Sequence, residues 1–233
     1  VDKINIINVK AYKTGCLPSK AISRTFFIGE GSTPSYTIPV LSINTDSSNY
    51  FSDQTGIYVY GNNALGNYGG SGMAWERPTF IEYFDVNKQL IFSEKAGTRL
   101  NGHGSRHSTV KNLRIHARSI YGDSKINANI FSNSNINEFK HLLIRSGGHR
   151  PDCLPRDELA TDMVSGLHFD APLYQYTRTY INGEYWGIHA LKEKLDGKYL
   201  SEKYSIAEDD IVILNFNSET DHGLASDSTH YQN

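Results

Sequence analysis

The fold is decided by residues 174–204, which read YQYTRTYINGEYWGIHALKEKLDGKYLSEKY. Ring and polar residues alternate over 174–180, as in a strand that buries one face. Asn182-Gly183 is typical of a tight hairpin turn, because both residues tolerate positive φ. A second strand is expected over 184–191. The apolar residues then recur at helical spacing over 191–204. The stretch therefore predicts a β-hairpin that leads directly into a helix.

A cluster of charged residues lies where this hairpin meets the helix. Lys192, Glu193, Lys194 and Asp196 follow one another within five positions. Charges at a strand-to-helix junction beside aromatic rings are compatible with a functional site, although the pattern itself gives more weight to the alternative. The alternative is a hairpin that closes a sheet and is followed by a solvated helix. The pattern by itself leaves both interpretations open.

The rest of the chain predicts further strands and one more helix. Six strands are expected in the first part, over 3–12, 22–28, 36–44, 56–61, 77–85 and 88–94. Later strands are expected over 98–101, 111–118, 139–145 and 211–216, with a helix over 156–169 whose apolar stripe is Leu159, Met163 and Val164. These patterns predict an α+β fold: an antiparallel β region over 1–95, then a lobe with two helices over 96–233.

Composition excludes some classes of protein and suggests an origin for the chain. A net charge of −2 gives no general attraction to nucleic acid. No apolar stretch approaches the ~20 residues of a membrane-spanning helix, and no signal peptide is recognisable. The only two cysteines, Cys16 and Cys153, are expected to be separate thiols. Because the chain starts at Val1 and ends in a loop-like tail, we expect a piece of a longer protein.

The loop over 102–108, Gly-His-Gly-Ser-Arg-His-Ser, has a composition that suits anions. Glycines expose backbone N–H groups, and the Arg, His and Ser side chains add donors. The loop lacks the residue order of either a P-loop or a dinucleotide-binding motif, so an ordinary turn is the alternative. In the strand that follows, Arg114, His116 and Arg118 alternate with apolar residues. One face of that strand is therefore predicted to be basic.

The sequence contains few motifs for other chemistries. His103 and His107 are four positions apart but lie in the predicted loop, so a zinc site is not favoured, and there is no Gly-x-Ser-x-Gly elbow. A carboxylate pair for glycoside hydrolysis stays open, although nothing singles one out. A nucleotide site needs a strand Lys near the phosphates and an acid that orients it. Lys111 and Glu193 are candidates for that pair; the alternative is an exposed strand Lys and a helix-start Glu.

Several stretches resemble the CotH kinase family, a group of atypical protein kinases found in bacterial surface proteins. The most specific is the Ile-Asn-Gly-Glu-Tyr-Trp-Gly-Ile hairpin followed by x-x-x-Glu-x-x-Asp. The resemblance covers most of the chain and rests on residues 37–62, 76–85, 97–122, 139–148, 156–164 and 180–204. It implies a distant relative of the protein-kinase fold that carries out Mg-ATP-dependent phosphoryl transfer to protein, with ATP and Mg²⁺ as cofactors.

Carried over by motif, the resemblance implies a set of polar residues near the nucleotide: Arg99, Lys111, Arg114, Arg145, Glu193 and Asp196. Lys111 would contact phosphate, and Glu193 would hold Lys111. The family's catalytic and metal-binding aspartates lie in an Asp-x-x-x-x-Asn-like and a Trp-Asp-x-Asp-like stretch, and we identify neither stretch in this sequence. We therefore expect the N-terminal lobe of such a kinase, cut before its catalytic half and inactive alone, with no catalytic residue to assign.

Two further hypotheses belong to other classes of protein. One is a non-catalytic secreted or cell-surface module that binds glycan or protein through its Tyr- and Trp-bearing strands. The other is an accessory domain for glycan processing. A kinase lobe needs the Lys111–Glu193 pair and a binding module does not. An extracellular or cell-surface location is implied by the resemblance, while the protein substrate is not indicated.

Overall fold

The computed structural model describes residues 4–28, 37–132, 134–147, 155–215, 219–224 and 226–231. Its strands are β1 (Asn5–Val9), β2 (Ile22–Phe26), β3 (Val40–Asn44), β4 (Arg77–Phe84), β5 (Leu90–Leu100), β6 (Leu113–His116), β7 (Ile126–Asn127), β8 (Glu138–Phe139), β9 (His141–Arg145), β10 (Tyr174–Ile181), β11 (Glu184–Glu193), β12 (Ile213–Leu214) and β13 (Thr220–His222). Its α-helices are α1 (Ser47–Phe51), α2 (Arg156–Val164), α3 (Gly197–Tyr204) and α4 (Asp227–Tyr231).

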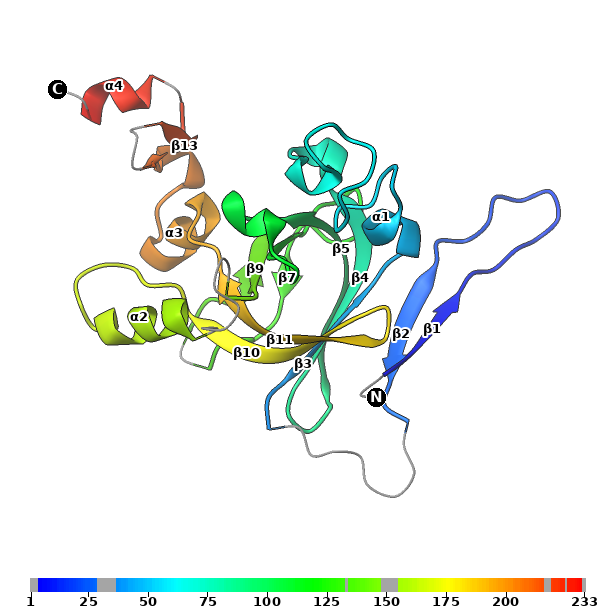
Figure 1. Ribbon diagram of the computed structural model, residues 1–233. Helices are drawn as coiled ribbons and strands as arrows, with labels where there is room; N and C mark the ends of the chain where they lie inside the picture. The colour runs from blue at the N-terminus through cyan, green and yellow to red at the C-terminus, as the bar shows by residue number, and fades with distance from the viewer. Residues whose placement is uncertain are drawn as a thin grey trace.

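A closed β-barrel forms the centre of the molecule (Figure 1). Its strands follow the order β10-β11-β9-β6-β5-β4-β3, and neighbouring strands are antiparallel within this series. The barrel closes where β3 pairs with β10 in parallel, from Val40 opposite Arg178 to Ile43 opposite Ile181. Alternate residues of each strand therefore point into the barrel or away from it.

The barrel interior is a continuous apolar core. Its fully buried members come from strands far apart in sequence and include Leu41, Ile43, Ile81, Ile115, Leu142, Ile144 and Leu191. The hairpin over 174–193 contributes to this core as predicted. Its turn has φ of +50° at Asn182 and +85° at Gly183, the left-handed values that a two-residue hairpin of this kind requires.

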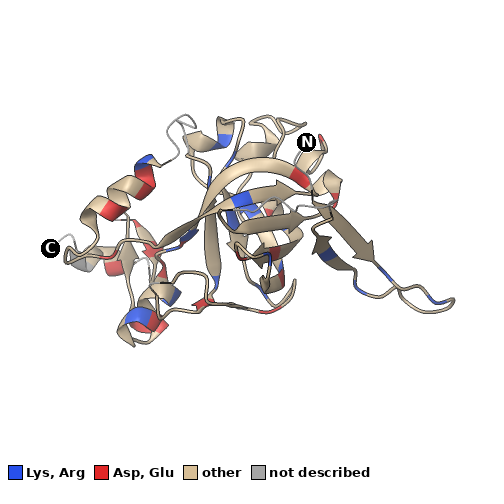
Figure 2. Ribbon diagram, turned by 90° about the horizontal axis from the view of Figure 1, so that it is seen from below, with Lys and Arg blue, Asp and Glu red and all other residues tan. Residues whose placement is uncertain are grey.

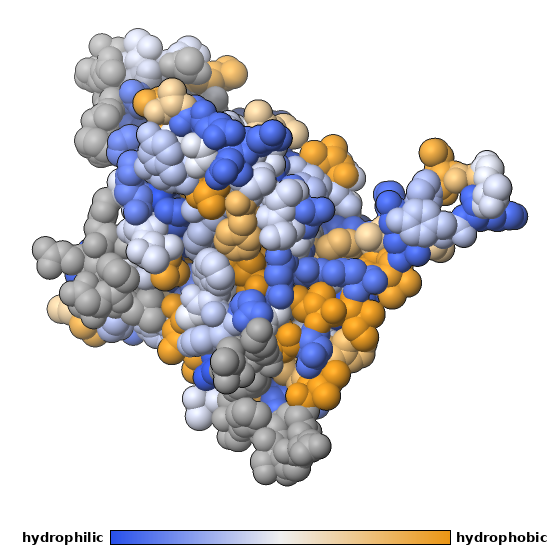
Figure 3. Space-filling view, turned by 45° about the vertical axis from the view of Figure 1, so that its right-hand side comes forward, coloured by the Kyte–Doolittle hydropathy of each residue, from blue (hydrophilic) through white to orange (hydrophobic). Residues whose placement is uncertain are grey.

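Strands β1 and β2 form a separate hairpin that projects from the barrel (Figure 1). Several hydrogen bonds join it to the barrel: the Ile4 amide donates to the Gly183 carbonyl at 3.0 Å, the Thr25 amide donates to Glu82 Oε2 at 2.7 Å, and the Thr25 hydroxyl donates to Ser42 Oγ at 2.8 Å. A Cβ at Gly183 would lie 2.7 Å from the Ile4 oxygen, so the close approach requires glycine. Hydrophobic side chains gather near the base of this projection in Figure 3.

Two local predictions are wrong. Residues 56–61 form turns, not a strand. The amides of Ile57 and Tyr58 donate to the carbonyls of Asn49 and Tyr50 in α1, and both side chains are buried in the core. Helix α2 ends at Val164, and its predicted apolar stripe is mostly exposed, since Leu159 is 58% and Met163 78% accessible. The side chain that α2 buries is Glu158.

The predicted α+β class is confirmed, because antiparallel strands dominate and helices accompany them. The boundary predicted after residue 95 stays a prediction; the barrel takes strands from both sides of that position. None of the described helices has the length and apolar character needed to cross a bilayer. Cys16 is a free, exposed thiol, whereas Cys153 lies outside the described residues.

Candidate functional site: a cationic face of the barrel

The outer face of β5, β6, β9 and β11 carries three of the six predicted site residues. Registry places Arg99 of β5 opposite Arg114 of β6, and Arg114 opposite Leu143 of β9. Leu143 pairs in turn with Lys192 of β11, and Arg145 of β9 pairs with Ala190. Residues opposite one another project from the same face of a sheet. Arg99, Arg114, Arg145 and Lys192 therefore share one face, which we call the cationic face.

Arg114 lies at the middle of this face and is incompletely partnered. Its Nη2 donates to Asn101 Oδ1 at 2.8 Å, whereas its buried Nε has no hydrogen-bond partner among the described residues. Burial lowers the pKa of Arg114, and the positive charge of Arg99 lowers it further. Like charges directly opposite on neighbouring strands repel each other. An anion placed between the two guanidinium groups would relieve that repulsion and accept the unused N–H.

Helix α2 packs its acidic residues against the basic residues of this face. Lys192 Nζ lies 3.2 Å from Glu158 Oε1, and both side chains are buried. Arg145 forms an ion pair with Asp157, the residue before Glu158. Asp162, one turn further along, accepts a hydrogen bond from Tyr174 of β10 at 2.7 Å. Figure 2 shows this distribution, with Lys and Arg on the central strands and acidic residues frequent on the helices.

A row of polar residues continues the face toward α3. Asp196 caps α3 by accepting the Tyr199 amide at 3.1 Å, and its other oxygen lies 2.8 Å from His141 Nδ1. Burial acts to raise the pKa of Asp196, but the hydrogen bonds with His141 and the Tyr199 amide, together with the positive charge of Lys194, lower it below its usual value. The rings of His141 and His116 meet edge to face at 4.9 Å between centroids. Burial, with the charges of His141 and Arg99, lowers the pKa of His116 to about 2.

Lys111 lies off the cationic face, in the loop between β5 and β6. Its ammonium donates to the carbonyl oxygens of Arg106 and Ser108 at 2.6 and 2.8 Å and lies 4.9 Å from the centroid of the Tyr68 ring. Burial lowers its pKa. Arg106 of the same loop donates to the carbonyls of Gly69 and Gly70. The basic residues of this loop therefore bind its own and neighbouring backbone.

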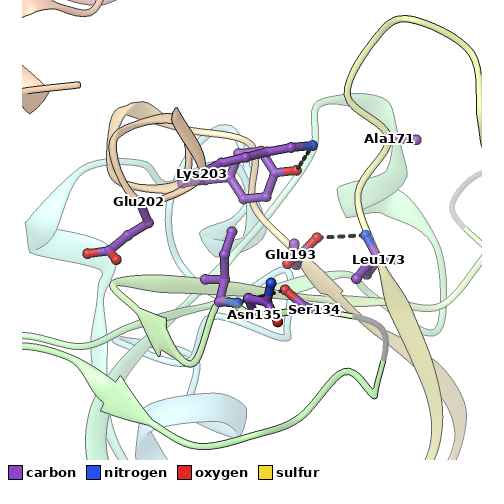
Figure 4. Close-up of a pocket in the computed structure, with 9 residues that line it drawn as sticks. Ser134, Asn135, Ala171, Leu173, Glu193, Glu202 and Lys203 are labelled. Atoms are coloured by element: carbon purple, nitrogen blue, oxygen red, sulfur yellow. Dashed lines mark hydrogen bonds between the residues drawn. The ribbon is translucent and has the colours of Figure 1, made fainter. Parts of the chain in front are cut away.

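Glu193 projects from the opposite face to Lys192. It pairs with Leu142, a core residue, and its Oε2 accepts the Leu173 amide at 2.8 Å (Figure 4). Burial raises the pKa of Glu193. The structure thus does not bring Lys111 and Glu193 together, because one is bonded within a loop and the other points away from the cationic face. Of the six predicted residues, Arg99, Arg114 and Arg145 share that face, and Asp196 lies beside it.

Among the described residues, the Lys–Glu pair with both side chains buried is Lys192–Glu158, which the sequence analysis missed. Lys192 was noted only as part of a charged cluster, and Glu158 only as part of a helix. The signal was the position of Lys192 one residue before Glu193, since neighbours on a strand point to opposite faces. An acidic first turn in α2, Asp157-Glu158, was the matching signal on the other side.

One face of the sheet is basic, the acidic residues of α2 pack against that face, and the β10–β11 hairpin of the same sheet leads into α3. The comparison with protein families identifies the class of this module: the model described as CotH kinase protein matches residues 98–233, more than half of the chain. The chain therefore belongs to the CotH kinase family. A search of curated proteins finds no match.

The two cofactors that the family implies fit the described residues unequally. The cationic face offers donors to phosphate, including the unpartnered Arg114 Nε. For a metal, the described residues contain no cluster of three or more His, Cys, Asp or Glu side chains in ligating positions. We therefore assign no Mg²⁺ ligand and derive no step through a metal.

Proposed function

We propose that the cationic face binds the phosphates of ATP and that this chain is the nucleotide-binding part of an atypical protein kinase that acts with Mg²⁺. Arg99 and Arg114 would contact the phosphate oxygens, and Arg145 would lie at the edge of the same site. Arginine suits this role because its fixed fork of N–H groups matches phosphate oxygens.

The observation that carries the proposal is the opposition of Arg99 and Arg114. Two guanidinium groups face each other across β5 and β6, and one has a buried N–H without a partner. In a folded domain such a donor is costly unless something binds it. The neighbouring cations are already neutralised, Arg145 by Asp157 and Lys192 by Glu158. Arg99 and Arg114 form no ion pair with a carboxylate among the described residues, although the charges of Asp221 and Asp196 act on Arg114 from a distance.

Binding, and not turnover, is proposed for the chain itself. In the described part of the chain, the cationic face carries no aspartate from the family's catalytic motifs. The Asp-x-x-x-x-Asn spacing occurs at Asp210 to Asn215, which run into β12 and do not belong to that face, and the sequence has no Trp-Asp-x-Asp. Phosphoryl transfer depends on neutralising the charge that builds up on the transferred group. The arginine side chains of the cationic face can neutralise phosphate charge, but none of them is assigned as a base for an attacking hydroxyl.

A thermal-shift titration with ATP, with and without Mg²⁺, tests the proposal. A ligand at ~100 times its Kd stabilises the folded state by roughly 2.7 kcal/mol, which is readily seen as a higher Tm. Arg114→Met should weaken ATP binding about tenfold or more, because a hydrogen bond to a charged group contributes ~1.5–3 kcal/mol. Adenosine, which has no phosphate, should give a much smaller shift.

Arg24→Gln is the matched control, since Arg24 lies on the separate hairpin with half of its side chain exposed. It should bind ATP like wild type. Equal shifts with ATP in wild type and Arg114→Met would remove the cationic face from the site. No shift at millimolar ATP would contradict the proposal and favour the alternative, a non-catalytic module that binds glycan or protein.

A further inference from the structure

A pocket lies on the opposite side of β11 from the cationic face. Its volume is about 480 Å³, and it opens between α3, the segment before β10 and the loop that contains Ser134. Figure 4 shows Glu193 and Leu173 at its floor, with Lys203 and Glu202 on the side of α3. Because Glu193 and Lys192 are neighbours on one strand, this pocket and the cationic face are separate sites.

The floor of the pocket holds a carboxylate that is only half satisfied. Glu193 is 2% exposed, and its Oε2 accepts the Leu173 amide at 2.8 Å. Its Oε1 is buried and has no hydrogen-bond partner among the described residues. Interaction with the Ser134 hydroxyl acts to lower the pKa of Glu193, but burial acts more strongly in the opposite direction. A buried acceptor of this kind is costly, and it marks a place where a donor is missing.

The charges around Glu193 leave it without a cation of its own. Lys203 bonds to Asp170 and to the Tyr199 hydroxyl, at 3.2 Å for the latter, and Glu202 pairs with Lys198. These contacts satisfy the titratable groups on the α3 side of the pocket with one another. Burial raises the pKa of Glu193, so the ionised carboxylate lacks sufficient compensation from Lys203 nearby.

The apolar part of the wall is small. Leu173, Ala171 and Ile136 line the pocket beside the carboxylate, and Ser134, Asn135 and Tyr199 add polar groups. A ligand that fits must therefore combine one charged donor with a short hydrocarbon body. We propose that this pocket binds a small primary ammonium compound, with its ammonium on Glu193 Oε1 and its alkyl part against Leu173 and Ile136.

A pair of matched probes tests this proposal on the intact chain. Propylammonium and 1-propanol have nearly the same shape, and only the first is charged. Backbone amide shifts of Leu173, Ser134 and Tyr199 in two-dimensional NMR spectra report on the pocket. Propylammonium should saturate these shifts and bind about tenfold or more tightly than 1-propanol, since a charged hydrogen bond is stronger than a neutral one. Potassium chloride at equal concentration serves as the blank.

The variants Glu193→Gln and Glu94→Gln complete the test. Glu94 is also a partly buried strand carboxylate whose pKa is raised by burial, but it lies on β5. Propylammonium should lose its advantage over 1-propanol in Glu193→Gln and keep it in Glu94→Gln. Binding by wild type should also strengthen as rising pH ionises Glu193, a result that does not depend on any variant folding.

Three results would overturn the assignment. Equal binding of propylammonium and 1-propanol to wild type would show an apolar cavity only. Unchanged propylammonium binding in a folded Glu193→Gln variant would place the ammonium elsewhere. Absence of saturable shifts in the three reporter residues would mean that the pocket binds no such ligand. The test contains no nucleotide, so its outcome is independent of the function proposed for the cationic face.

Discussion

The ammonium of Lys111 ties together the loop that joins β5 and β6. It is almost fully buried and donates to two carbonyl oxygens of that loop, those of Arg106 and Ser108. A charged donor that satisfies buried acceptors stabilises the fold more than a neutral one. The residue therefore has a structural task that does not require a ligand.

Lys111→Met should lower the free energy of unfolding by ~1.5–3 kcal/mol, because both carbonyls lose a charged donor. Urea denaturation monitored by fluorescence measures this change. ATP binding by the folded variant should stay within about twofold of wild type, since Lys111 lies off the cationic face. Lys95→Met, which removes a half-buried ammonium above the Phe80 ring on β5, should cost less than about 1 kcal/mol.

The opposite pattern would restore the role that the sequence suggested for Lys111. If Lys111→Met were as stable as wild type but lost its thermal shift with ATP, the ammonium would have to contact phosphate. The loop would then adopt another arrangement when nucleotide is bound.

Helix α2 is held on the barrel by ion pairs and not by an apolar stripe. Glu158 is its one buried residue, and its partner Lys192 is buried beneath it. Buried ion pairs contribute little beyond an apolar contact of the same shape, but breaking one leaves an uncompensated charge. The packing of α2 is therefore stable when Glu158 and Lys192 are both present or both replaced, and is weakened when only one of them is replaced.

Glu158→Gln should destabilise the chain by ~3–5 kcal/mol, because the Lys192 ammonium is left buried without its partner. The double variant Glu158→Met/Lys192→Met should recover most of that loss. Chemical denaturation measures both, and hydrogen exchange shows whether α2 opens first. Leu159→Ala, at an exposed position of the same helix, should change stability by no more than about 0.5 kcal/mol. A large effect of Leu159→Ala with none for Glu158→Gln would show that α2 packs through its apolar residues.

At the scale of the whole molecule, local signals were readable from the sequence and long-range ones were not. The hairpin around Asn182-Gly183 was predictable because turn residues and alternation act within a few positions. Closure of the barrel could not be predicted from the sequence. Strands β3 and β10 are more than a hundred residues apart, and no local pattern encodes a parallel pairing of that kind. The α+β class and the family resemblance were both correct.

The same distinction between local and long-range signals applies to the candidate site. Alternation in 111–118 predicted a basic strand face, and Arg114 lies on it with Arg99 opposite. The partner of Glu193 could not be read from the sequence, because a one-residue step along a strand moves a side chain to the other face. Glu193 and Lys192 show the consequence: the first lines a pocket near α3, and the second pairs with α2.

The whole fold should lose stability in mild acid because two histidines are buried in their neutral form. Burial lowers the pKa of His116 to about 2 and that of His189 to about 4, from 6.5 in each case. Below pH 6.5 the unfolded chain takes up protons that the folded chain refuses, so stability falls as the pH falls and is fully present above that value. Each histidine contributes about 1.4 kcal/mol per pH unit to the slope.

Urea denaturation at a series of pH values between neutrality and about pH 5 measures this slope. His189→Gln removes one of the two contributions and should reduce the slope between these limits by about half, whatever its effect at neutral pH. His103→Gln, at an exposed position, should leave the slope unchanged. A flat profile in wild type would mean that the barrel accepts a proton on both rings, which requires water to reach His189 inside the barrel and His116 beneath the arginines. The same measurement would then show that the cationic face is more open than its packing indicates.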